Sequence, residues 1–130
     1  MATWNDLRNY ITSKYKIKDD KGNLLRLGFN LDDGRAQDIL IVDGGKIMDS
    51  DWAVVETAVA EQGQISPRDL LVHNAGLKAG TLGVYDNGIV VFRYSVRLND
   101  LDAGEIEDAL RIVTLTGDEF ESILTGSDTF

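Results

Sequence analysis

The chain has 130 residues, the size of a single domain that can bury a core without a metal or a disulfide bond. It contains no cysteine, which excludes disulfide frameworks, cysteine-based zinc sites, thiol nucleophiles and iron–sulfur ligation. The formal net charge of -9 is concentrated in residues 98–130, where Arg111 is the one cation, so we expect neither nucleic acid nor an anionic membrane as a partner.

The polar start of the chain lacks the apolar run of a signal peptide, and no later apolar segment approaches the roughly 20 residues that span a bilayer. We therefore expect a soluble, cytoplasmic protein whose residues 1–130 form one domain.

Thr3 is a candidate N-cap for a first helix that ends near Lys16. Its apolar positions recur at helical spacing: Trp4, Leu7, Ile11 and Tyr15. In residues 25–31 apolar side chains alternate with other residues, the two-residue period of a half-buried strand.

Residues 32–34 (DDG) predict a turn, and residues 35–42 predict an antiparallel partner strand that ends at Gly44-Gly45. Residues 52–60 (WAVVETAVA) are ambiguous, because the alanines and the glutamate suit a helix whereas the valines and the threonine suit a strand. We favour a strand.

Residues 66–76 are bounded like a helix, with Ser66 as N-cap, Pro67 at the first helical position and Gly76 as the stop. Leu70 and Leu71 are expected to face the core. Residues 81–98 then predict a hairpin around the turn 86–88 (DNG).

One face of the second hairpin strand carries Val90, Phe92, Tyr94, Val96 and Leu98. The other face carries Ile89, Val91, Arg93, Ser95 and Arg97. Residues 102–124 predict an amphipathic helix with a weak point at residues 114–117, and residues 125–130 predict a frayed tail.

The element order is α-β-β-β-α-β-β-α, which predicts an α+β domain with a single antiparallel sheet. The one histidine, His73, follows Asp69 by one helical turn, so a carboxylate-oriented imidazole is geometrically possible. A surface histidine beside an acid is the more common origin of that spacing. No zinc, calcium, dinucleotide or phosphate motif is present, so we expect no catalytic residues, no metal and no cofactor.

The outer face of the sheet remains as a candidate protein-binding or dimer face, with large apolar residues beside cations. Its expected members are Trp52, Val54, Ile89, Val91, Arg93 and Arg97. Cover by the domain's own helices is the alternative explanation of these apolar residues.

The segments ISPRDLLVHNA, VYDNGIVVFRYSVRL and LNDLDAGEIEDALRIV resemble the YbjN-like proteins, which share the fold of type III secretion chaperones. The resemblance covers nearly the whole chain and is sharpest in residues 70–113. It implies a homodimer that holds a client polypeptide on apolar patches and free strand edges, and it transfers no active-site residue.

The favoured hypothesis is a non-enzymatic, chaperone-like module that binds a polypeptide segment or a partner protein as a homodimer. The alternative is a regulatory or structural domain with one specific folded partner. A hydrolase that uses Asp69 and His73 is a distant third.

Overall fold

Three α-helices, a short 3-10 helix and six strands make up the described part of the chain, residues 1–31 and 34–125 of this computed structural model. In chain order they are α1 (Trp4–Lys14), β1 (Asp19–Asp20), β2 (Leu24–Asn30), β3 (Ala36–Ile47), β4 (Ser50–Glu61), η1 (Gln62–Gln64), α2 (Pro67–Ala75), β5 (Thr81–Val84), β6 (Ile89–Arg97) and α3 (Ala103–Thr125).

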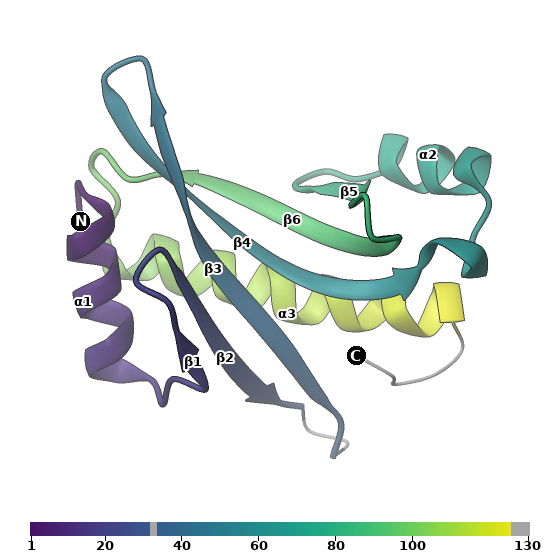
Figure 1. The fold of residues 1–130 in the computed structure, drawn as a ribbon, viewed down its shortest axis with the longest axis horizontal. Coiled ribbons are helices and arrows are strands. Elements are labelled where there is room, and N and C mark those ends of the chain that lie inside the picture. Colours follow the sequence, from purple (N-terminus) through teal and green to yellow (C-terminus); the bar gives the residue numbers. More distant parts are fainter. Residues whose placement is uncertain (32–33, 126–130) are drawn as a thin grey trace.

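All strands join one antiparallel sheet in the order β1-β2-β3-β4-β6-β5. The long helix α3 crosses one face of the sheet, called the inner face here (Figure 1). Helix α1 lies beside the sheet, next to β1 and β2 (Figure 1). The predicted α+β class with a single antiparallel sheet is confirmed. The two-residue strand β1 is an addition that the sequence pattern did not predict.

The three helices begin at the polar caps that their sequences supply. Thr3 and Asp6 form a reciprocal capping box at α1, and the Ser66 side chain accepts from the Asp69 N–H while Pro67 opens α2. At α3, the Asp102 N–H donates to the Glu105 carboxylate and the Glu105 N–H donates to the Asp102 carboxylate, which is the same reciprocal arrangement. Local sequence therefore determines where each helix begins.

Strand β3 is longer than expected. Gly44-Gly45 does not end it, because the strand continues to Ile47 through a register shift between Asp43 and Gly45 and turns at Met48 into β4. The glycines thus mark a bulge within a long hairpin that projects beyond the sheet (Figure 1). Residues 52–60 belong to a strand, as favoured above.

Two expectations about the helices are wrong. Leu70 is buried in the core, but Leu71 is 67% exposed because it faces away from the sheet. Helix α3 continues without a break through residues 114–117, where its Thr114 hydroxyl bonds to the Leu110 carbonyl. The turn at Asp32-Asp33 and the tail at 126–130 lie outside the described residues.

The core lies between the inner face and the helices. The fully buried side chains of the sheet include Leu25, Leu27, Ile39, Ile41, Val55 and Phe92, and those of the helices include Leu7, Ile11, Ile106 and Val113. Phe120 is also buried, with its ring centroid 6.2 Å from that of Phe92. Helix α3 thus buries an apolar stripe that comprises Ile106, Leu110, Val113 and Phe120, called the α3 stripe here. Burial of the α3 stripe makes the helix an integral part of the fold.

Helix α3 lies so close to β4 that only glycine fits at the crossing. A Cβ added to Gly117 would lie 2.3 Å from Cγ2 of Thr57. Thr57 cannot easily turn away, because its hydroxyl donates to the Asp38 carbonyl at 2.6 Å and accepts from the Gln37 amide at 2.7 Å. The Gly117–Thr57 contact therefore sets the distance between α3 and the sheet.

We expect Gly117→Ala to lower the free energy of unfolding by about 1–2 kcal/mol, because overpacking outweighs the better helix propensity of alanine. The double variant Gly117→Ala/Thr57→Ser should recover most of this loss, since serine keeps the hydroxyl and lacks the clashing methyl group. Urea unfolding measures both variants.

The control for this prediction is Gly104→Ala, in the first turn of the same helix, where the added Cβ meets its nearest atom at an ordinary 3.4 Å. It should be neutral or slightly stabilising. Equal changes in the free energy of unfolding at positions 104 and 117 would contradict the claim that the contact with Thr57 excludes a larger residue at position 117.

Candidate polypeptide-binding surfaces

The six residues expected on one sheet face all lie on the outer face, opposite α3. Trp52 pairs directly with Arg97 across β4 and β6, and Arg93 pairs with Glu56. By the alternation along each strand, Val54, Val91 and Ile89 belong to the same face. The described helices leave this face uncovered (Figure 1).

The outer face is less exposed than its sequence pattern indicated. Val54 and Val91 are only 9% and 5% exposed. Arg97 is exposed, and Trp52 and Ile89 are half-buried. Three half-buried aliphatic residues of β2 and β3 extend the face: Leu24, Leu40 and Val42.

A carboxylate that we did not predict lies at the centre of this face. Glu56 is buried between the Tyr85 hydroxyl, which donates to it at 2.5 Å, and the Arg93 Nε, at 3.1 Å. Burial, followed by the hydrogen bond to Glu56, raises the pKa of Tyr85. The cluster is charge-balanced, so the centre of the outer face is polar without a net charge.

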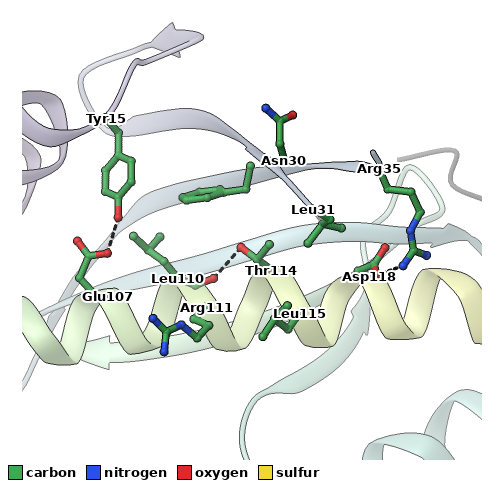
Figure 2. A pocket seen from close by; sticks show the side chains of 11 residues that line it. Tyr15, Asn30, Leu31, Arg35, Glu107, Leu110, Arg111, Thr114, Leu115 and Asp118 are labelled. Carbon is green, nitrogen blue, oxygen red and sulfur yellow. Dashed lines mark hydrogen bonds and ion pairs between the residues drawn. The ribbon is translucent and has the colours of Figure 1, made fainter. Parts of the chain in front are cut away.

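A groove of about 500 Å³ lies on the inner side, between the edge strand β2 and helix α3 (Figure 2). Tyr15, Phe29 and Leu31 line it from the sheet side, and Leu110 and Leu115 line it from α3. Leu115 is 55% exposed and is not part of the buried α3 stripe. The groove thus combines an apolar strip, open to solvent, with polar and charged side chains.

Glu107 closes one end of the groove and joins α1 to α3. Its carboxylate accepts hydrogen bonds from the Tyr10 hydroxyl at 2.6 Å, from the Tyr15 hydroxyl and from the Lys14 ammonium at 2.8 Å. Burial by itself raises the pKa of Glu107, but these hydrogen bonds outweigh burial and lower the pKa below its ordinary value. The carboxylate at this end of the groove is therefore neutralised by the Lys14 ammonium.

The other end of the groove carries a second neutralised acid. Arg35 pairs with Asp118 at 2.7 Å and donates to the Ser122 hydroxyl at 3.0 Å. Arg111 lies between Glu107 and Asp118 on α3, exposed, and no carboxylate of the described residues lies within ion-pair distance of it. Two cations and two acids line the groove, so its lining charges balance, and the one charge left without an ion-pair partner among the described residues is positive.

Strand β2 has an unpaired edge directly above this groove. Strand β1 pairs only with Leu25 and Arg26, so within the described chain β2 has no strand neighbour on that side from Leu27 to Asn30. The Leu24 and Arg26 carbonyls point to the edge, where they accept from Lys21 and Lys18.

Main-chain groups of a strand alternate between its two sides. The N–H and C=O groups of Gly28 and Asn30 therefore also point to the free edge.

The opposite edge of the sheet is blocked. Helix α2 lies along β5, and its Asn74 side chain accepts the Leu82 N–H at 3.0 Å. Such cover is a common protection of an edge strand. A smaller apolar recess of about 250 Å³ remains between α2 and this edge, lined in part by Leu71 and Val84. Strand addition is thus favoured at β2 and not at β5.

The structure assigns His73 a packing contact. Its ring lies edge-on to Phe120 with centroids 5.9 Å apart. Among the described residues, no three His, Cys, Asp or Glu side chains form a group that could hold a metal ion. No described helix is long and apolar enough to cross a membrane.

Sequence reasoning missed the groove, because its walls come from the first and last thirds of the chain. Two signals pointed to it. Arg111 interrupts the acidic C-terminal third, and Leu115 is an apolar residue outside the periodic stripe of its helix. Neither signal identifies Tyr15 or Phe29 as the opposite wall.

No protein-family model and no curated protein sequence matches this chain. Among solved structures, the chain is similar to one in the HopA1–SchA chaperone–effector complex, with a TM-score of 0.57 and 11% sequence identity. The match covers 94% of this chain and 89% of that chain. The fold, three α-helices with one six-stranded antiparallel sheet in the described residues, therefore matches the fold of a chain in that chaperone–effector complex.

We expect Tyr15→Phe to change the alkaline stability of the protein. Burial, followed by the hydrogen bond to Glu107, raises the pKa of Tyr15 from 10.0 to about 12. A raised pKa stabilises the fold fully below pH 10, and this contribution is lost as the pH rises through the folded pKa. The variant should therefore lose less stability than the wild type between about pH 9 and about pH 12.

Urea unfolding at both pH values tests this, with Tyr94→Phe as the control outside the Glu107 cluster. Identical pH dependence in the wild type and in Tyr15→Phe would show that the fold does not raise the pKa of Tyr15.

Proposed function

We propose that this protein is a non-enzymatic, chaperone-like module that binds an extended polypeptide segment at the edge of β2. The observation that carries the proposal is the position of the groove directly beneath an unpaired strand edge. A segment that adds to β2 forms main-chain hydrogen bonds with Gly28 and Asn30. Every second side chain of that segment then enters the groove beside Phe29.

The composition of the groove suits this mode of binding. Main-chain pairing is independent of sequence, whereas an apolar trough between Phe29, Leu110 and Leu115 selects aliphatic or aromatic side chains. The two acids at its ends are already paired, so they present no uncompensated charge to an apolar side chain. Affinity then comes from the edge, and selectivity comes from the groove.

The fold comparison supports the proposal at the level of architecture. The similar solved structure is described as a chaperone–effector complex. The resemblance of residues 70–113 to YbjN-like proteins supports the narrower proposal that this chain is YbjN-like. A cytoplasmic location belongs to the same proposal.

We also propose that the outer face mediates a homodimer. Trp52, Leu40 and Val42 supply apolar area that the described helices do not cover, and Arg97 supplies charge at its border. The outer face and the groove lie on opposite sides of the sheet. A dimer through one therefore leaves the other open to a client.

We expect Asn30→Pro to weaken peptide binding about fivefold to tenfold, because proline removes the N–H that points to the free edge. The probe is a dye-labelled octapeptide, selected on the wild-type protein from a displayed library, and fluorescence anisotropy measures its affinity. Proline is tolerated on an edge strand, so the variant should keep its fold, which circular dichroism verifies.

The matched control is Asn30→Ala, which removes the side chain and keeps the N–H. It should bind the octapeptide within about twofold of the wild type. Loss of binding in both variants, or in neither, would contradict strand addition at β2.

We expect Arg97→Glu to shift the protein from dimer towards monomer, because an exposed cation at the border of the outer face becomes an anion. Light scattering at several protein concentrations gives the mass. Arg68→Glu on α2 makes the same change of net charge away from this face and should keep the dimer. A monomeric wild type would refute the dimer. A dimeric wild type with an equally dimeric Arg97→Glu variant would show that the outer face does not mediate it.

A further inference from the structure

The charges that line the groove are arranged in an alternating row along α3. Glu107, Arg111 and Asp118 are the ionisable helix residues of the groove, and only Arg111 has no ion-pair partner among the described residues. Lys14 neutralises the first acid and Arg35 the last. The one charge left for an incoming segment is therefore positive.

We infer that the segment bound in the groove carries an acidic side chain, Asp or Glu, close to its apolar anchor, and that Arg111 selects it. This inference rests on the proposed peptide-binding function and names the chemistry of the partner. Arg111 would form the ion pair with the acid, while the anchor packs between Phe29 and Leu115.

The spacing of helix and strand sets the distance between acid and anchor. Arg111 and Leu115 are one helical turn apart, which corresponds to about 5.4–6 Å along α3. Side chains on one face of a strand recur every two residues, at about 6.6 Å. Where the added segment runs along α3, an acid two residues from the anchor reaches Arg111 while the anchor reaches Leu115.

The overall charge of -9 would favour a basic partner, but local charge decides the contact in the groove. At physiological ionic strength charges are screened beyond about 8 Å, so an exposed acid in the last turns of α3 acts weakly on the segment. Asp108, one turn before Arg111, is exposed and does not line the groove. Arg111 acts at contact distance. A lysine or arginine at the same position of the segment would face an unpaired guanidinium, which is unfavourable.

The test is a selection of displayed octapeptides on the wild type and on Arg111→Glu, a substitution of an exposed residue that should leave the fold intact. On the wild type we expect enrichment of Asp or Glu two positions from an aliphatic or aromatic residue. On Arg111→Glu we expect Lys or Arg at that position. Arg68→Glu, the charge-matched control on α2, should select the wild-type pattern.

The best wild-type octapeptide then gives the magnitude by anisotropy. Replacement of its acid by the neutral amide should weaken binding about threefold to fivefold, the range of a partly exposed ion pair. Binding to Arg111→Gln should be insensitive to that replacement. This difference separates an ion pair with Arg111 from a general effect of the acid on the peptide.

Two outcomes would overturn the inference, and they are distinguishable. If apolar anchors are enriched without an acid, and Asn30→Pro still weakens binding about fivefold to tenfold, the edge and the groove bind peptide but Arg111 does not select it. If no octapeptide is enriched on the wild type, the proposed peptide-binding function fails together with this inference.

Discussion

The contact between Gly117 of α3 and Thr57 of β4 is the constraint on which the rest of the structure depends. Because a glycine lies at the crossing, α3 packs directly onto the centre of the inner face. The helix then buries Ile106, Val113 and Phe120 against the sheet. A larger residue at position 117 would lift α3 and weaken this packing along its length.

This position of α3 on the inner face leaves two parts of the sheet uncovered. Helix α3 packs mainly on β4, β6 and β3, and a trough remains between the helix and the edge strand β2. The outer face has no helix of the described chain above it. The groove and the outer face are thus both consequences of one helix that covers only the middle of one face.

Paired charges shape these surfaces more than net charge does. Glu107 ties α1 to α3 through three donors, and Glu56 is satisfied by Tyr85 and Arg93 on the outer face. Each is a partly or fully buried carboxylate whose desolvation is offset by hydrogen bonds. An acidic protein can therefore present surfaces that are locally neutral or positive. Total charge is a poor guide to what such a surface binds.

Much of the local structure follows from the sequence alone, because it depends on near neighbours in the chain. Caps at Thr3, Ser66 and Asp102 set the helix starts, and the two-residue period set the strands and their faces. The assignment of Trp52 and Arg97 to one face followed from that period.

Where several conformations were locally possible, the tertiary structure decided. Gly44-Gly45 can end a strand or form a bulge, and pairing with β4 selected the bulge. Leu71 lies on an amphipathic helix, but the single neighbouring strand edge buries only Leu70. From the sequence alone, Gly117 indicates a weak point in a helix. In the structure it is the position where α3 contacts Thr57.

The sequence by itself determined most of the helices and strands, the α+β class and the two faces of the sheet, since these depend on caps and periods within a few residues. Only the tertiary structure decided that Tyr15 and Phe29 lie opposite Leu110 and Arg111 to form a groove. Residues about 80–95 positions apart meet there through packing of α3 on the sheet, and no local pattern encodes that meeting.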